Sequence, residues 1–364
     1  MRKALIIIFL LLVLSACSVE TIEKDPSLKG TLNENKDNET APNEETTDSE
    51  TEKYTFDKTY FLFTINTQDY VYPQESVETI NRIIDIHEKY NVAVDIYLED
   101  QIFQYYAYDA PELVERLKDS EVVAISYHVR APHPTDVDYW YLNEKTDTEE
   151  LYEFLLPYEE YKMNLETGEV DTSMPGGYQF IKDTIGYAPI VVPMKSDSQT
   201  VDEVMARIYS EKGATWTLLH ERGIKLGEQE QGMYVRPEDA EIKWYDSYEE
   251  YSQGSSAEEM ILEIMENEGI TAGDYAFVNL KMHENNFIEG DGTAAYWETY
   301  GTDKDPPFDL SLAYNVPVWP EEQREMMFQM YEDAVKYVSE HPELYITINA
   351  KDLDPLLEAS QENI

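Results

Sequence analysis

Short apolar runs alternate with segments of helical periodicity from Tyr54 onward, and this alternation limits the possible folds more than any other feature. Residues 60–65 are an unbroken run typical of a buried strand, and residues 76–90 carry apolar side chains at helical spacing. Residues 92–98 alternate apolar and polar positions, and residues 122–126 form another short apolar run. Strands that alternate with helices in this way indicate βαβ units and a parallel sheet.

The same rhythm continues to the end of the chain. Further strands are predicted at residues 189–194, 215–219, 275–280 and 344–349, and helices at residues 111–118, 177–185, 199–212, 257–268 and 320–341. Residues 134–176 and 224–252 interrupt the rhythm and are interpreted as insertions. About seven strand–helix units in one domain, residues 56–364, favour a distorted (β/α)7-type α/β barrel with insertions. A doubly wound open sheet is the alternative.

The N-terminus has the pattern of a secretory signal. Arg2 and Lys3 precede an apolar run over residues 4–14, and Leu14-Ser15-Ala16 leads into Cys17. The run is shorter than the roughly 20 residues that cross a bilayer. A cysteine at the cleavage position resembles the lipobox of bacterial lipoproteins, so residues 1–17 predict a signal peptide with lipidation at Cys17. An ordinary signal peptide with an incidental cysteine is the other interpretation.

This resemblance implies an extracytoplasmic protein that is lipid-anchored to the cell membrane. Cys17 is the only cysteine, which excludes internal disulfides and a CxxC zinc site. Residues 18–55 are rich in Glu, Asp, Asn, Thr and Ser and have few large apolar side chains. Such a segment cannot bury enough surface to fold, so we expect a disordered acidic tether.

The chain carries a formal charge of −48, from 27 basic and 75 acidic residues. This charge argues against nucleic acid as a partner, because phosphates would be repelled. Acidity can also attract cationic or amine-bearing ligands, or simply keep the surface solvated, and both interpretations stay open.

Polar side chains gather where the predicted strands end. Asp69 follows the first strand, His128 and His133 follow the third, and His283 follows the strand that begins near residue 275. In α/β barrels these ends carry the functional groups. One carboxylate and two imidazoles can hold zinc and leave a position for water, so Asp69, His128 and His133 are candidate metal ligands. Polar loop residues without a metal are the alternative.

These motifs resemble those of the NodB-type polysaccharide deacetylases over most of residues 58–350. Residues 63–69, Phe-Thr-Ile-Asn-Thr-Gln-Asp, are similar to the first motif of that family, and Leu280-Lys281-Met282-His283 is similar to a late one. The resemblance implies a barrel of the polysaccharide deacetylase kind and a divalent metal, with Zn²⁺ as the expected ion, on Asp69, His128 and His133. It also implies that His283 acts as general acid while a metal-bound hydroxide attacks the acetyl group.

The chain departs from the family pattern at important positions. The histidine spacing is five residues here, against four in the family, and Gln68 occupies the place of the catalytic base. An amide cannot accept a proton near neutral pH, and Asn66 has the same defect. A carboxylate from another strand end could replace the base, since position decides that role. The candidates are Glu99, Asp100, Asp197 and Glu284.

Two further side chains are candidates for substrate binding. Arg130, between the two histidines, could grip a carboxylate or phosphate of the ligand, or it could pair with a surface acid. Trp140, within Tyr139-Trp140-Tyr141, could stack on a sugar ring, or these aromatics could pack within their loop.

Three functions remain open from the sequence. The first is a membrane-anchored, metal-dependent hydrolase of C–N bonds other than peptide bonds, which deacetylates a cell-envelope glycan. The second is a catalytically degenerate barrel that acts as a surface glycan-binding lipoprotein. A glycosidase is the third, and it would need two facing carboxylates.

Overall fold

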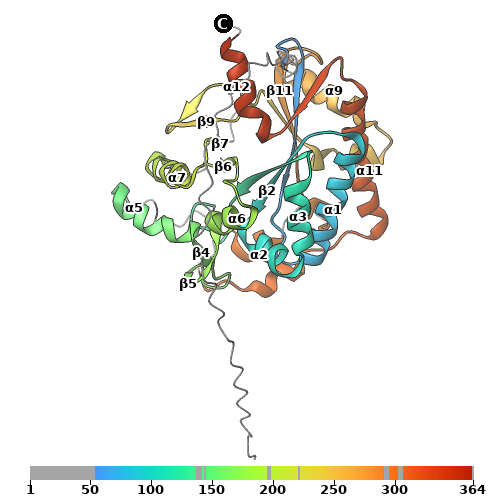
Figure 1. Cartoon of the computed structure of the whole chain (residues 1–364). Coiled ribbons are helices and arrows are strands. Elements are labelled where there is room, and N and C mark those ends of the chain that lie inside the picture. The colour runs from blue at the N-terminus through green and yellow to red at the C-terminus, as the bar shows by residue number, and fades with distance from the viewer. Residues whose placement is uncertain are drawn as a thin grey trace, which may run out of the picture. The chain divides into compact units, whose positions relative to one another are not determined.

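Parallel strands that follow one another in sequence order form the centre of the fold (Figure 1). The computed structural model describes residues 54–136, 142, 145–194, 198–219, 222–290, 295–301 and 306–362. Cys17, the predicted tether up to residue 53, Trp140 and Asp197 lie outside the described residues. The strands are β1 (Thr59–Asn66), β2 (Val94–Glu99), β3 (Val123–His128), β4 (Tyr161–Met163), β5 (Val170–Pro175), β6 (Val191–Pro193), β7 (Trp216–Leu218), β8 (Gln229–Glu230), β9 (Met233–Val235), β10 (Ala240–Lys243), β11 (Ala276–His283) and β12 (Tyr345–Ile348).

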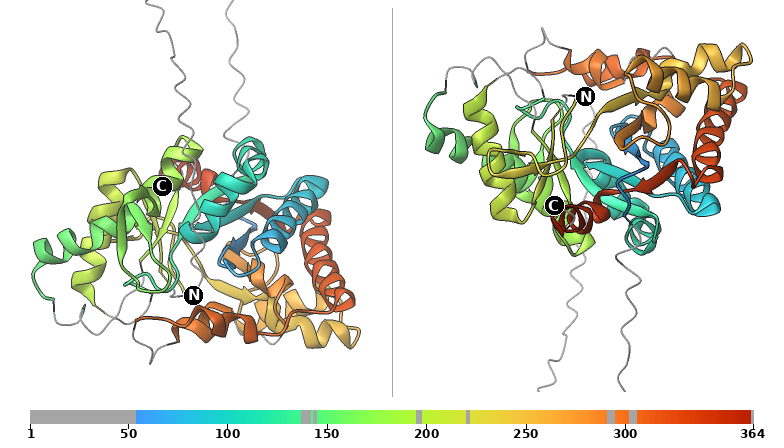
Figure 2. Two further views of the ribbon diagram at one scale, coloured as in Figure 1. Left: turned by 90° about the horizontal axis from the view of Figure 1, so that it is seen from below. Right: turned by 90° about the horizontal axis from the view of Figure 1, so that it is seen from above.

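The α-helices cover the outside of these strands, as two further views show (Figure 2). They are α1 (Pro73–Tyr90), α2 (Asp100–Asp109), α3 (Pro111–Asp119), α5 (Thr148–Leu155), α6 (Gly177–Ile185), α7 (Gln199–Lys212), α8 (Tyr248–Ser252), α9 (Ala257–Asn267), α10 (Ala295–Tyr300), α11 (Glu321–Glu340) and α12 (Leu353–Glu362). Helices α1 and α11 lie side by side although they are far apart in sequence, and Arg82 of α1 bonds Glu325 of α11 at 2.6 Å. Among the described residues, none of the helices has the length and apolar content to cross a lipid bilayer.

The strand order is that of a distorted barrel. One sheet has the order β10-β11-β1-β2-β3, and β6-β7-β9-β8 form another. The amide of Ile190, just before β6, donates to Ile125 of β3 at 3.0 Å and so joins the two sheets on one side. On the other side the chain passes directly from β9 to β10. Because β11 returns to pair with β1, the order runs around a ring, although β9 and β10 are not paired with each other in the described sheets. The α/β fold with parallel strands is therefore confirmed.

The last strand has an unusual place in this ring. Residues 59–62 of β1 pair with β12, while residues 64–66 of the same strand pair with β2. The C-terminal strand therefore lies beside the first half of β1, where β2 does not reach. The backbone amide of Ala350, just after β12, donates to the carboxylate of Asp95 in β2 at 3.0 Å and so holds the end of β12 against β2.

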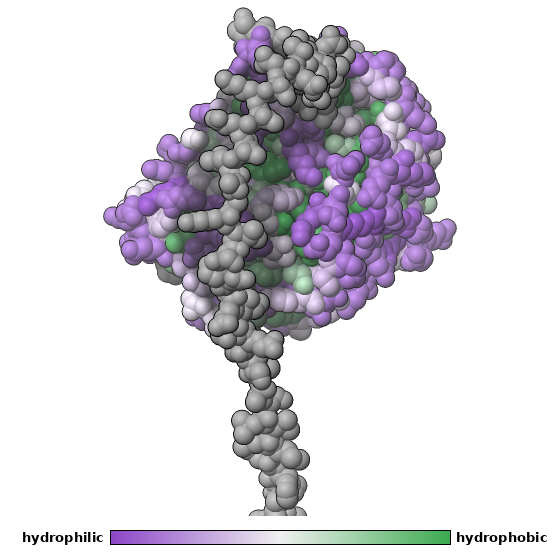
Figure 3. Space-filling view, viewed as in Figure 1, coloured by the Kyte–Doolittle hydropathy of each residue, from purple (hydrophilic) through white to green (hydrophobic). Residues whose placement is uncertain are grey.

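The two faces of the central strands differ in chemistry. Phe61, Phe63 and Ile65 of β1 belong to the large buried cluster that packs against the helices. Thr64 and Asn66 alternate with them and face the other way, where they are buried among polar groups. The inner face of the ring is thus polar near the carboxyl ends of the strands. Figure 3 shows that the outer surface is mainly hydrophilic in this view, as the charge of the chain requires.

Two parts of the sequence-based interpretation were wrong. Residues 224–252 are not only an insertion, because they contain β9 and β10, which pair with β7 and β11 of the two sheets. Helix α2 was not predicted at all. Glu99 caps its first turn by accepting the amides of Gln101 and Ile102 at 2.8 and 3.1 Å, and Ile102 and Phe103 bury their side chains in the main core.

Candidate functional site

The carboxyl ends of β1, β3 and β11 meet in one buried polar network. Asn66 of β1 stands opposite His283 of β11 in the strand register, and Glu99 of β2 stands opposite His128 of β3. The parallel register therefore brings the predicted strand-end residues to the same end of the barrel, as their sequence positions indicate. Their side chains are mostly shielded from solvent.

Gln68 lies at the centre of this network and is 4% exposed. Its side-chain oxygen accepts a hydrogen bond of 2.6 Å from Nε of Arg130. Its side-chain nitrogen donates to Oδ1 of Asn285 at 2.6 Å. One amide therefore ties together the segments that follow β1, β3 and β11.

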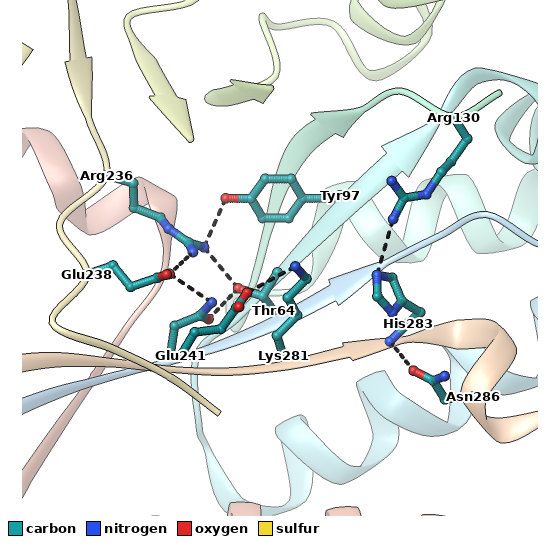
Figure 4. A network of polar contacts seen from close by, with 10 residues as sticks. Thr64, Tyr97, Arg130, Arg236, Glu238, Glu241, Lys281, His283 and Asn286 are labelled. Carbon is teal, nitrogen blue, oxygen red and sulfur yellow. Dashed lines mark hydrogen bonds and ion pairs between the residues drawn. The ribbon is translucent and has the colours of Figure 1, made fainter. Parts of the chain in front are cut away.

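Arg130 reaches from the segment after β3 toward the end of β11. Its Nη2 lies 3.2 Å from Nε2 of His283 (Figure 4). Its Nη1 lies 3.5 Å from Oδ1 of Asp136. A guanidinium can only donate, so the contact with Arg130 is a hydrogen bond only while Nε2 of His283 accepts. In this arrangement His283 cannot offer an Nε2 proton to a leaving group. Of the two roles left open for Arg130, the structure contains the pairing with an acid.

Glu284 follows His283 and is fully buried. Its Oε1 accepts the backbone amides of Gln68 and Asp69, and its Oε2 accepts the amide of Asn285 at 3.1 Å. Burial, and then the nearby charge of Asp69, raises the pKa of Glu284 to about 8. The carboxyl thus holds the segment after β1 against the end of β11, and its acceptor sites are already used by the backbone.

Further carboxyls surround this point. Burial, and then the charge of Asp69, raises the pKa of Glu289 to about 9, and Glu289 accepts the side-chain amide of Asn285 at 2.6 Å. Burial raises the pKa of Asp69 itself to about 6 and of Asp100 to about 6. The pKa of Glu99 is also well above its usual range because of its burial. The strand ends therefore hold an acidic cluster of low solvent access.

The three predicted metal ligands are all buried at this end of the barrel. Oδ1 of Asp69 accepts the amides of Val71 and Tyr72 at 3.0 and 2.9 Å. Nδ1 of His133 lies 2.8 Å from the hydroxyl of Thr135, and Nε2 lies 3.2 Å from Oε1 of Glu159 but makes no hydrogen bond among the described residues. His128 ends β3.

The assignment of these three side chains to a metal ion stays a prediction. Across the described ranges, no group of three or more His, Cys, Asp or Glu side chains is arranged so that it could hold one. Glu159, which lies beside His133, is fully buried and accepts the hydroxyl of Tyr209 at 2.8 Å. Oδ2 of Asp69 and Nε2 of His133 are buried without a hydrogen-bond partner among the described residues.

A second buried network fills the barrel below the strand ends (Figure 4). Arg236, which follows β9 and is 1% exposed, donates to Thr64 at 3.0 Å, to Tyr97 at 3.1 Å and to Glu238 at 2.5 Å. Asn279 of β11 donates to the same Glu238 oxygen at 3.1 Å. This network joins β1, β2, β9 and β11 through their inner faces. Sequence reasoning missed it, because the only signal was a basic residue between two short strands.

Helix α2 adds a third feature that the sequence did not reveal. It forms one side of a pocket of about 550 Å³ beside the strand ends, and the hairpin β4–β5 contributes the facing residues. Gln101, Gln104, Tyr105 and Tyr108 of α2 line the pocket. Amphipathic spacing in residues 100–109, with Ile102, Phe103 and Tyr106 buried, is the sequence signal that could have found this helix.

These features define an α/β barrel-type protein with a closed polar network at the carboxyl ends of its strands. Comparisons with family models and with curated proteins gave no match. Among solved structures, the chain is similar to the peptidoglycan deacetylase PdaC from Bacillus subtilis, with 13% identity over 85% of this chain and 96% of that one, at a TM-score of 0.41.

Two other solved structures have a comparable likeness. A putative polysaccharide deacetylase from Mycobacterium smegmatis is 8% identical over 84% of this chain and 92% of that one, with a TM-score of 0.42. A CE4 family pseudoenzyme from Bacillus anthracis is 11% identical over 64% of this chain and 58% of that one, with a TM-score of 0.34. Because these TM-scores lie below 0.5, the fold assignment rests on the strand order and register of the chain itself.

Proposed function

We propose that this protein is a lipid-anchored, non-hydrolytic glycan-binding protein built on a catalytically degenerate deacetylase-like barrel. The motifs around Gln68 and His283 supply the ligand class, since they resemble those of enzymes that act on acetylated polysaccharides. The sequence of Cys17 and its flanks supplies the location, at the cell membrane. The alternative is a metal-dependent deacetylase of a cell-envelope glycan.

The observation that carries the proposal is the bonding of Gln68. At this position a deacetylase of the resembled family needs a carboxylate that can take a proton from water. Here both ends of the amide are engaged, by Arg130 at 2.6 Å and by Asn285 at 2.6 Å. The group therefore serves as a tie between strand ends, and it offers no free basic atom.

Glu284 does not replace the missing base. Its two oxygens accept three backbone amides, and the side chain is fully buried. A general base must reach the proton that it removes, within hydrogen-bond distance or through one water. The glycosidase alternative is weakened by the same fact, because it needs two carboxyls that face each other across an accessible site.

The experiment measures binding and hydrolysis on the same samples. The purified full chain, loaded with zinc, is incubated with N-acetylglucosamine oligomers, acetate release is measured, and binding is followed by calorimetry. We expect saturable binding, no acetate release and no stoichiometric zinc. Zinc-dependent acetate release that a chelator removes and that His128→Ala abolishes would overturn the proposal in favour of the hydrolase.

A variant sharpens this test. Gln68→Asp supplies the carboxylate that the family resemblance calls for. Gln253→Asp makes the same change at an exposed position outside this network and serves as the control. If the barrel is only a disarmed enzyme with an intact metal site, Gln68→Asp should release acetate and the control should not. If the barrel has lost its metal site as well as its base, both variants should remain inactive.

A further inference from the structure

One face of α2 presents polar and aromatic side chains to the pocket beside it. The pocket has a volume of about 550 Å³, and the helix residues that line it include Gln101, Tyr105, Tyr108 and Asp109. Tyr105 follows Gln101 by four positions and precedes the other two by three and four, so all four side chains share one face. Phe103 and Tyr106 belong to the main core. The face toward the pocket is thus distinct from the face that anchors the helix.

Tyr108 offers an aromatic ring to this pocket. The residue is 60% exposed, and its ring stacks on Phe180 with centroids 5.8 Å apart and an interplanar angle of 24°. Phe180 therefore covers one face of the tyrosine ring and fixes its orientation, and the opposite face stays accessible. The face of an aromatic ring is electron-rich and attracts cations, above all ammonium groups that carry alkyl substituents.

Two carboxylates stand around the same pocket. Asp109 is the last residue of α2 and Glu166 lies in the turn between β4 and β5, and both line the pocket with exposed side chains. Within the described part of the chain, neither carboxylate has a salt-bridge partner. Lys162 also lines the pocket, but it stands opposite Asp171 in the hairpin register and so has an opposite charge beside it.

The side of the pocket that faces α2 has a fixed backbone. Oδ1 of Asn164 accepts the amides of Glu166 and Thr167 at 2.9 and 3.0 Å, which closes the turn of the hairpin. The carbonyl of Glu166 accepts the amide of Phe308 at 2.7 Å, and the hydroxyl of Tyr300 donates to the carbonyl of Leu165 at 3.0 Å. Figure 1 shows α2 and the β4–β5 hairpin at the same end of the molecule. The carboxylate of Glu166 is therefore carried by a turn that is bonded on both sides.

We propose that this pocket, between α2 and the β4–β5 hairpin, binds a small organic cation whose ammonium group carries alkyl substituents. The ammonium would lie over the open face of Tyr108, with Asp109 and Glu166 as counter-charges. Its alkyl groups would contact Met163 and Leu165, which line the same pocket. The charge of −48 raises the concentration of any cation near the surface. The inference adds a second class of ligand to the glycan binding proposed above and does not depend on it.

The test compares a cation with its neutral analogue on the full chain. The probes are choline and 3,3-dimethylbutanol, in which a carbon atom replaces the charged nitrogen at nearly the same shape. We expect calorimetry to show saturable binding of choline and binding of the analogue that is weaker by about tenfold or more. Raising sodium chloride from about 0.02 M to about 0.5 M should weaken the binding of choline, because both carboxylates are exposed to solvent.

Variants locate the site. Tyr108→Ala should weaken choline binding about two- to fivefold, and Tyr108→Phe should bind like the wild type, because the ring and its stacking on Phe180 are kept. Asp109→Asn should also weaken binding, since it removes one counter-charge. Asp119→Asn is its matched control, because Asp119 is the exposed last residue of α3 as Asp109 is of α2, and it should leave affinity unchanged.

Several results would overturn this proposal. Equal affinity for choline and 3,3-dimethylbutanol would show that charge is not recognised, and no saturable binding of choline would show that the site does not exist. Wild-type affinity in Tyr108→Ala would place the cation elsewhere, and equal losses in Asp109→Asn and Asp119→Asn would indicate general surface charge. Melting temperatures within about 2 °C of wild type show that the variants are folded. Each of these results leaves glycan binding, measured on the same samples, to stand or fall separately.

Discussion

The guanidinium of Arg130 and the side-chain amide of Gln68 are joined by a hydrogen bond of 2.6 Å, which links the segments after β3 and β1. Because Gln68 also donates to Asn285, the end of β11 is part of the same connection. Gln68, at the position where the resembled family has its catalytic base, thus connects the three segments that follow β1, β3 and β11. The predictions below follow from this role and from the other buried groups.

Removing the Gln68 side chain should cost stability. Gln68→Ala deletes a bond to a charged donor and a neutral bond, and it leaves Asn285 without one partner, so we expect a loss of about 2–4 kcal/mol in the free energy of unfolding. Urea denaturation measures this. Gln253→Ala, an exposed control, should change the free energy by less than about 0.5 kcal/mol. Equal losses in the two variants would show that Gln68 is not a structural tie.

Glu284 should make stability fall as pH rises. Its pKa of about 8 in the folded protein exceeds its ordinary value of 4.5, so between these values the folded state holds a proton that the unfolded chain has released. The free energy of unfolding must then decrease with pH across this window, by up to about 1.4 kcal/mol per pH unit for one group. Denaturation midpoints at pH 5, 6.5 and 8 would measure the slope.

Glu284→Gln isolates this contribution, because the amide keeps an acceptor oxygen and cannot ionise. The variant should have a shallower decline than the wild type over the same window, with the difference largest near pH 8. Glu263→Gln, an exposed change on α9, should keep the wild-type slope. Parallel curves for wild type and Glu284→Gln would contradict the raised pKa.

Arg236 should be among the most sensitive residues in the barrel. Arg236→Met leaves Glu238, which is 3% exposed, without its counter-charge, and it also removes the donors to Thr64 and Tyr97. Breaking such a buried pair costs about 3–5 kcal/mol. The double variant Arg236→Met, Glu238→Gln should recover part of the loss, since no uncompensated charge remains. A double variant no more stable than the single one would argue against the charge as the cause.

Cys17 should decide the location of the protein. Its place at the end of the signal predicts that Cys17→Ser releases the protein from the membrane into the soluble fraction. Fractionation followed by a high-salt wash tests this, with the wild type as reference. Retention of the variant on washed membranes would mean that the anchor lies elsewhere.

The sequence predicted the fold well wherever a segment was long and periodic. Residues 177–185 and 199–212 were predicted as helices, and α6 and α7 have those bounds. Three elements were not predicted from the sequence. Helix α2 follows the end of a strand without a break, and β9 and β10 are only three and four residues long between polar neighbours. Strands of that length carry too little periodicity to separate from loops.

The candidate site was predicted in position but not in bonding. Strand ends could be read from the order of residues, so Asp69, His128 and His283 were placed at the correct end of the barrel. Which atoms meet there depends on side-chain rotamers and on partners from distant segments. Glu159, for example, lies in the insertion after β3 with its Oε1 3.2 Å from Nε2 of His133, and the local sequence of neither residue predicts that contact.

The pairing of β12 with the first half of β1 has a consequence for folding during synthesis. Thr59 in the first strand stands opposite Tyr345 in the last, so the edge of β1 stays unpaired until nearly the whole chain exists. Contacts of such long sequence separation are slow to form. A chain interrupted before residue 348 would lack the partner of its own first strand. The first half of β1 therefore gains its second neighbouring strand only after almost the whole chain has been synthesised.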